Sequence, residues 1–340
     1  MISHPLPADL IPVTILTGFL GSGKTTLLKR ILEGGHGYRI AVIENEFAAE
    51  GIDRGLLMHA GAEHIVEMNN GCICCSVRGD LARALGDLQA RRAAGELAFD
   101  HVIIETTGMA APGPVAQTFF ADPEVARHYL LDAIVTVVDA RHAPRQLDLH
   151  PEVQWQVGFA DRILLSKTNL VDQAALAALR RRLLAINCRA AIQKVSFGNV
   201  PIGAVLDIRG FNLNAALDLE PDFPHADGPR HGDGVASFVY RNARPMDLAL
   251  IEHFLDAMVA RFGSRMMRYK GILNLAGVPC RAVFQGVHML MGSELGAAWG
   301  AMEYRETRLV FIGQDLPQKL FHDGLERCVH VEREGRPCQR

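Results

Sequence analysis

The chain has 340 residues and a formal net charge of −3, with 35 lysines and arginines against 38 acidic residues. A broad nucleic-acid surface needs a basic excess, so we expect no nucleic acid partner, although a single nucleotide can still bind locally. The length predicts about two domains. The longest apolar run near the start, residues 10–20, is too short to cross a bilayer and lacks the basic flank of an export signal. We therefore expect a cytoplasmic protein that does not bind membranes.

The first two thirds of the chain alternate short apolar runs with helical patterns. Strands are predicted at 12–17, 39–43, 102–104, 133–138 and 163–165, with a weaker one at 194–197. Helices are predicted at 24–32, 78–94, 152–160 and 173–186. This alternation is typical of a parallel sheet with helices on both faces. The sequence therefore predicts an α/β domain of the P-loop type over residues 1–210.

The pattern changes near residue 208, where Gly, Pro, Asp and Asn become frequent. We expect a linker at 211–234 and a smaller C-terminal α+β domain at 235–330. The elements predicted in this domain are strands at 236–240, 266–275, 281–291 and 307–313, and helices at 246–262 and 317–328.

A glycine-rich motif after the first predicted strand matches G-x-x-x-x-G-K-[ST] in full. Its glycines let backbone N–H groups surround phosphate oxygens, its lysine supplies a charge, and its first threonine can bind Mg²⁺. The alternative is a chance glycine turn, but a strand precedes the motif and a helix follows it. The predicted nucleotide-binding residues here are Gly18, Gly21, Ser22, Gly23, Lys24, Thr25 and Thr26.

Two later segments fit the same site. The apolar run 101–105 ends in Glu105, which predicts a second Mg²⁺ ligand, and Gly108 offers an N–H near a γ-phosphate. The run 163–165 leads to Lys167, whose stem can cover a purine ring, and Asn169, which stands where an Asp would read guanine. The alternatives are an ordinary strand end and a helix-capping turn.

Seven cysteines are present, and Cys72, Cys74 and Cys75 fall within four residues. An odd, crowded set is no disulfide framework, so it predicts reduced thiols that bind a soft metal such as Zn²⁺. Buried small side chains or a redox pair are the alternatives. The fourth ligand is left open among Glu44, Glu46, His64 and water. The acidic run that begins at Glu44 also fits a role in placing Mg²⁺ or the attacking water, with a solvated loop as the alternative.

In order, the runs GFLGSGKTTLL, ENEF, GCICC, ETTG and SKTN, followed by a small α+β domain, resemble the CobW-type metal-centre GTPases. The resemblance implies a P-loop GTPase of the class that includes the urease and hydrogenase nickel-insertion GTPases. It implies GTP, Mg²⁺ and Zn²⁺ as ligands, with Co²⁺ or Ni²⁺ as other metals, and a metallochaperone or insertase role. It assigns the phosphates and Mg²⁺ to residues 18–26, the Walker B acid to Glu105, and zinc to Cys72, Cys74 and Cys75.

We therefore predict a slow GTPase, with Lys24, Glu105 and Glu44 as catalytic residues, that moves a transition metal to a client metalloprotein. A homodimer is a further expectation. The alternatives are a nucleotide-gated chaperone with structural zinc and a P-loop small-molecule kinase. The sequence departs from the family pattern at Asn169, at Ala48 and Ala49 after the ENEF run, and in a linker without a His-rich run. Asn169 affects the choice of base, and the two alanines remove one metal ligand of the family pattern. The linker predicts fewer auxiliary metal sites.

Overall fold

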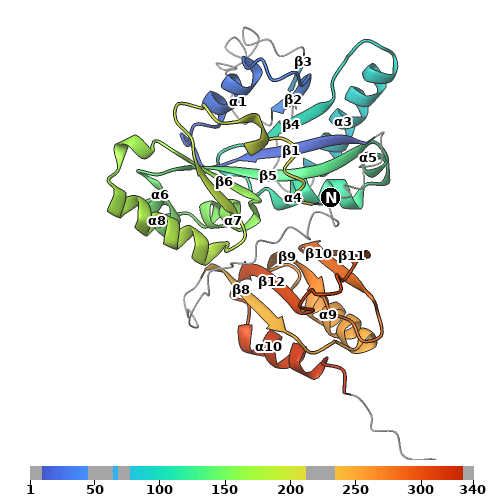
Figure 1. The fold of residues 1–340 in the computed structure, drawn as a ribbon. Helices are drawn as coiled ribbons and strands as arrows, with labels where there is room; N and C mark the ends of the chain where they lie inside the picture. Colours follow the sequence, from blue (N-terminus) through green and yellow to red (C-terminus); the bar gives the residue numbers. More distant parts are fainter. Residues whose placement is uncertain (1–9, 45–63, 68–76, 212–233, 332–340) are drawn as a thin grey trace, which may run out of the picture.

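The computed structural model describes residues 10–44, 64–67, 77–211 and 234–331. Its first sheet has seven strands, all parallel, in the order β3-β2-β4-β1-β5-β6-β7 (Figure 1). The strands are β1 (Ile11–Thr17), β2 (Ile40–Glu44), β3 (His64–Glu67), β4 (His101–Glu105), β5 (Tyr129–Asp139), β6 (Arg162–Ser166) and β7 (Ala191–Lys194).

Helices connect these strands and cover both faces of the sheet. They are α1 (Lys24–Leu32), α3 (Val77–Ala93), α4 (Gly113–Ala121), α5 (Pro123–His128), α6 (Ala143–Leu149), α7 (Pro151–Phe159) and α8 (Gln173–Ile186). Alternate side chains of β1 enter different cores: Val13 and Ile15 pack with α3, α4, α7 and α8, and Leu16 packs with α1 and the segment 195–206. The predicted parallel α/β fold is therefore confirmed.

The second sheet is antiparallel, with the order β11-β10-β9-β12-β8. Its strands are β8 (Val235–Asn242), β9 (Met266–Leu273), β10 (Cys280–Val287), β11 (Leu290–Ala298) and β12 (Thr307–Gln314). One face packs on α9 (Leu248–Phe262) and α10 (Gln318–Arg327), as the buried Phe311 and Phe321 show. The predicted C-terminal α+β architecture is confirmed.

The other face of the second sheet packs against the first domain. Met267 of β9 and Val310 of β12 belong to the same buried cluster as Val157 of α7. The Arg268 side chain is buried, forms an ion pair with Asp161 and lies 4.1 Å above the Phe211 ring. Most of the predicted linker, residues 212–233, lies outside the described residues. Among the described helices, none is long and apolar enough to cross a membrane.

Candidate functional site: a phosphate loop and its neighbours

The turn between β1 and α1 has a backbone that only glycine adopts without strain. Gly18, Gly21 and Gly23 have φ values of 143°, 71° and 103°, in the region that side chains disfavour. At Gly18 a Cβ would also lie 2.3 Å from the carbonyl oxygen of Val137. The loop thus wraps the N-terminus of α1, where backbone N–H groups and the helix dipole favour an anion.

Inside this loop, Lys24 and Ser22 are buried. The Lys24 ammonium donates to the carbonyl oxygen of Gly18 at 2.8 Å. Burial lowers the pKa of Lys24, and the nearby Glu105 carboxylate opposes that effect. The Ser22 Oγ is buried and has no hydrogen-bond partner in the described part of the chain. A cation and an unsatisfied hydroxyl in one loop fit a phosphate group.

The Thr25 Oγ1 lies 3.3 Å from Glu105 Oε1, at the end of β4. Thr26 follows on the exposed side of the same turn. A hydroxyl beside a carboxylate supplies the oxygen ligands that Mg²⁺ prefers, so the residues present fit that ion. The structure thus brings Thr25 and Glu105 together, and their roles toward Mg²⁺ stay predictions.

Gly108 lies against the phosphate loop: a Cβ at this residue would be 2.7 Å from the backbone nitrogen of Leu20. The segment is held before it by Thr106, whose N–H donates to Leu16 O at 3.0 Å and whose hydroxyl donates to Thr17 at 2.8 Å. The Gln156 amide holds the Gly108 carbonyl oxygen from the other side, at 3.1 Å. Gly108 is thus placed where it can respond to a bound phosphate.

The SKTN segment follows β6 and reaches back to the phosphate loop. Lys167 has a positive φ of 54°, and its Nζ donates to Gly21 O at 2.8 Å. Ser166 donates to the carbonyl oxygen of Ser22 at 2.6 Å. Asn169 is exposed in the short 3₁₀ helix Thr168–Leu170, two residues after Lys167.

Asp139 is a residue of this site that the sequence predictions missed. It ends β5, and its Oδ2 accepts from Lys167 Nζ at 2.7 Å and from His142 Nδ1 at 2.8 Å. Burial raises the pKa of Asp139, but hydrogen bonds from Lys167 and His142 outweigh this and hold it below its ordinary value. The signal was present in the sequence, because the apolar run 133–138 ends in a carboxylate as 101–104 does.

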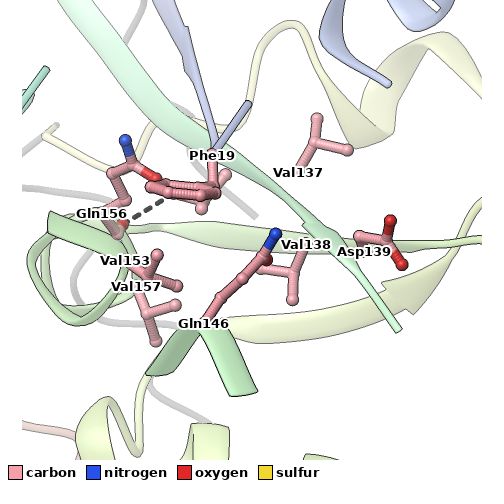
Figure 2. A pocket seen from close by; sticks show the side chains of 9 residues that line it. Phe19, Val137, Val138, Asp139, Gln146, Val153, Gln156 and Val157 are labelled. Carbon is pink, nitrogen blue, oxygen red and sulfur yellow. Dashed lines mark hydrogen bonds between the residues drawn. The ribbon is translucent and has the colours of Figure 1, made fainter. Parts of the chain in front are cut away.

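A small pocket lies beside the phosphate loop, between the end of β5 and α7 (Figure 2). It is lined by the Phe19 ring, by Val138 and Asp139 of β5, and by Val153 and Gln156 of α7. The Phe19 ring also packs on His150, just before α7, with ring centroids 4.6 Å apart and the planes tilted by 35°. The phosphate loop and α7 therefore face each other across this pocket.

Glu44 ends β2 and pairs in register with Glu105 on β4, and on the other side with Glu67 of β3. The register of β2 and β4 thus brings Glu44 and Glu105 to the carboxyl ends of neighbouring strands, next to the phosphate loop. His64, a candidate fourth ligand, begins β3 with its backbone in register with Ala41 of β2, and its ligand role stays a prediction. Cys72, Cys74, Cys75 and Glu46 lie outside the described residues. Within the described ranges, no three His, Cys, Asp or Glu side chains form a metal-binding group.

Comparisons with known proteins give one consistent result. Residues 12–194 match the family model "CobW/HypB/UreG, nucleotide-binding domain", and residues 235–329 match "Cobalamin synthesis protein cobW C-terminal domain". The chain is 41% identical over 310 residues to the zinc chaperone YjiA of Escherichia coli, covering 91% of this chain and 96% of that protein. It is 35% identical to the zinc chaperone CobW of Pseudomonas aeruginosa, covering 91% and 88%.

Solved structures agree with these matches. The zinc-bound YjiA GTPase from E. coli superposes with a TM-score of 0.75 at 34% identity, over 95% of this chain and 100% of that one. A zinc-bound triple mutant of the YjiA GTPase, in which one glutamate and two cysteines are alanine, gives a TM-score of 0.78 at 33% identity, with the same coverage.

Proposed function

Because the chain belongs to the CobW/HypB/UreG family of P-loop GTPases, we propose that it uses GTP binding and hydrolysis to deliver Zn²⁺ to a client metalloprotein. The observation that carries the proposal is the register of β2 and β4, which pairs Glu44 with Glu105 beside the Thr25 hydroxyl. The strand β2, which precedes the cysteines in the sequence, thus ends beside Glu105 and Thr25, the residues predicted to bind Mg²⁺.

At the nucleotide, Lys24 binds the outer phosphates and the glycine loop holds the others. Thr25 and Glu105 hold Mg²⁺, which supplies positive charge against the transferring phosphoryl oxygens when bound. Lys167 and Asn169 contact the base, and Glu44 orients water. Phosphoryl transfer depends on positive charge positioned at the transferring phosphoryl group. Hydrolysis by the isolated protein is slow, because a partner protein completes this set of charges.

At the metal, the proposed ligands are Cys72, Cys74 and Cys75, with Glu44 as a fourth. Zinc is the cargo that the names of the relatives support, and thiolates also accept Co²⁺ or Ni²⁺. The three thiolates leave the fourth position to Glu44, and we propose that zinc exchanges at this position, where the carboxylate is displaced. The client, a homodimer and a cytoplasmic location remain parts of the proposal, as does the division into domains at 1–210 and 235–330.

Cobalt loading tests the metal half. The wild type should take up one Co²⁺ and give a sulfur-to-cobalt charge-transfer band, which Cys74→Ala or Cys75→Ala removes. Loaded zinc should pass to a competing chelator, because a transferable ion must exchange. Metal binding that survives replacement of all three cysteines by alanine, or zinc that never exchanges, contradicts a thiolate delivery site.

A further inference from the structure

Gln156 is a buried amide in α7 to which the nucleotide site described above assigns no role. Only 1% of the residue is exposed. Its Nε2 lies 3.1 Å from two carbonyl oxygens, those of Gly108 and Ala110. Because both partners are acceptors, the amide must turn its N–H₂ group toward them. The side chain therefore fixes the backbone of the segment that follows the Walker B strand.

The opposite end of the same amide has no partner. Gln156 Oε1 is buried and lacks a hydrogen bond within the described part of the chain. A buried acceptor without a donor favours any rearrangement that brings an N–H to it. Figure 2 shows Gln156 beside the Phe19 ring of the phosphate loop. The amide is thus placed between the phosphate loop and the Gly108 segment.

The helix that carries Gln156 is tied to the C-terminal domain. Gln154 Oε1 accepts from the backbone N–H of Val235 at 3.0 Å, at the start of β8. The carbonyl oxygen of Phe159 accepts from Arg268 of β9, also at 3.0 Å. These bonds lie on either side of Gln156 in a helix of nine residues. The helix α7 is therefore hydrogen-bonded to β8 and β9 on either side of Gln156.

A second contact joins the Gly108 segment to the same domain. At Gly113, the first residue of α4, a Cβ would lie 2.7 Å from both His288 Nε2 and the Phe159 ring. His288 forms the turn between β10 and β11 and packs edge-on against Phe159 at 5.1 Å. The start of α4 therefore packs directly on the C-terminal domain, with no space for a side chain at Gly113.

We propose that Gln156 is a positioning residue for GTP hydrolysis, which sets the Gly108 peptide and makes α7 and the C-terminal domain respond to the γ-phosphate. The inference rests on the proposed function. The Gly108 N–H and carbonyl oxygen belong to two peptide planes that meet at the Gly108 Cα. A shift of Gly108 toward a γ-phosphate therefore displaces its carbonyl oxygen, and the bond to Gln156 must follow or break. A γ-phosphate then changes the contacts of α7 with β8 and β9. Linkage requires that whatever binds the C-terminal domain changes GTP affinity in return.

The chain contains a probe for this motion. Trp155 precedes Gln156, and Trp299 in the C-terminal domain is the second of only two tryptophans. The Trp299→Phe variant leaves Trp155 as the one fluorophore, on α7. Its emission should differ between the GDP complex and the complex with a non-hydrolysable GTP analogue. The double variant with Gln156→Glu should lose this difference, because a carboxylate cannot donate to two carbonyl oxygens.

Kinetics supply the second readout. In Gln156→Glu we expect GDP affinity within about two-fold of wild type, and kcat for GTP lower by about ten-fold, the loss of one to two hydrogen bonds. The matched control is Gln146→Glu, which places the same charge on the same pocket from α6. It should leave both the fluorescence difference and kcat unchanged.

Hydrogen exchange on the wild type keeps the proposal testable if the variant does not fold. Amides of residues 154–159 and 266–273 should exchange at different rates in the GDP and GTP-analogue complexes. If both nucleotides bind and these rates are equal, or if Gln156→Glu behaves as Gln146→Glu does, the inference is wrong. If neither nucleotide binds, the proposed function itself fails.

Discussion

The Lys167 ammonium lies 2.7 Å from Asp139 Oδ2 and 2.8 Å from the carbonyl oxygen of Gly21. Three elements thus meet at one side chain: the end of β5, the loop after β6 and the phosphate loop. These two contacts hold the Lys167 ammonium, and the prediction that its stem covers a purine base rests on them.

We expect Asp139→Asn to weaken binding of GDP and GTP alike, by about three- to ten-fold, because Lys167 loses its ionic partner. Isothermal titration of both nucleotides measures the effect. His142→Ala is the control, since the exposed His142 side chain contacts the same carboxylate but not the phosphate loop. Unchanged affinity in Asp139→Asn contradicts the role of Asp139 in holding Lys167.

Asn169 should relax base specificity. An aspartate would accept both guanine N–H groups, whereas the Asn169 amide turns one donor toward a donor. We expect weak discrimination between GTP and XTP. In Asn169→Asp, preference for GTP should rise by about ten- to a hundred-fold, from competition binding with both nucleotides.

Asp172 is the residue best placed to replace the missing carboxylate, but it is already in use. Its Oδ1 accepts from the Ala175 N–H at 2.7 Å and caps α8. We therefore expect Asp172→Ala to lower stability by about 1 kcal/mol and to leave base preference unchanged. Strong preference for GTP over XTP in the wild type, together with unchanged preference in Asp172→Ala, contradicts this description of the base pocket.

Lys24→Ala should abolish hydrolysis and weaken triphosphate binding without unfolding the chain. Loss of a buried cation at the phosphates costs several kcal/mol in the transition state, or a rate lower by about a hundred-fold or more. Lys29→Ala is the matched control, because Lys29 lies on the same helix and forms an exposed ion pair with Glu33 at 3.8 Å. Turnover near that of wild type in purified Lys24→Ala would refute the assignment.

Acid sensitivity should depend on His101. This residue is buried with its Nε2 3.0 Å from Thr14 Oγ1, and burial lowers its pKa to about 4. Between pH 6.5 and 4, His101 is protonated in the unfolded chain but not in the folded chain. The free energy of unfolding therefore decreases as the pH is lowered through this range. His101→Gln should reduce this loss by about 1–3 kcal/mol in urea unfolding at pH 7 and pH 5.

Asp132 acts in the opposite direction in the same network, since burial raises its pKa to about 6. Its folded form binds a proton that the unfolded form releases between pH 6 and 4, which stabilises the fold as pH falls. Asp132→Asn should therefore make the acid loss steeper. If both variants change the pH dependence in the same direction, these assignments are wrong.

The sequence predicted the architecture well where long-range packing agrees with local pattern. The helices at 24–32 and 173–186 begin and end as predicted. The strand predicted at 281–291 instead turns back at His288, whose φ is 53°, and β11 follows. That strand, LMGSELGAA, was missed because two glycines and three small residues weaken its pattern.

Residues whose roles depend on tertiary contacts could not be predicted in the same way. Gln156 looks like any polar residue of a helix until α7 packs beside Gly108. The strand predicted at 194–197 lies at Ala191–Lys194, because pairing with β6 decides its position rather than its weak apolar run. By contrast, Lys24 and Thr25 were predicted from motif spacing, because a phosphate loop demands those residue types in that order. Glu105 was predicted because it ends an apolar strand, as a Walker B acid does.

Nucleotide-dependent zinc affinity tests the central claim most directly. Apo protein is titrated with Zn²⁺ against a competing chelator, once with GDP and once with a non-hydrolysable GTP analogue bound. Glu44 and Glu105 lie side by side in register, so a γ-phosphate should alter the metal ligands, and we expect zinc Kd values that differ by about five-fold or more. Equal zinc Kd values in the two complexes, with both nucleotides bound, would contradict GTP-driven delivery of zinc.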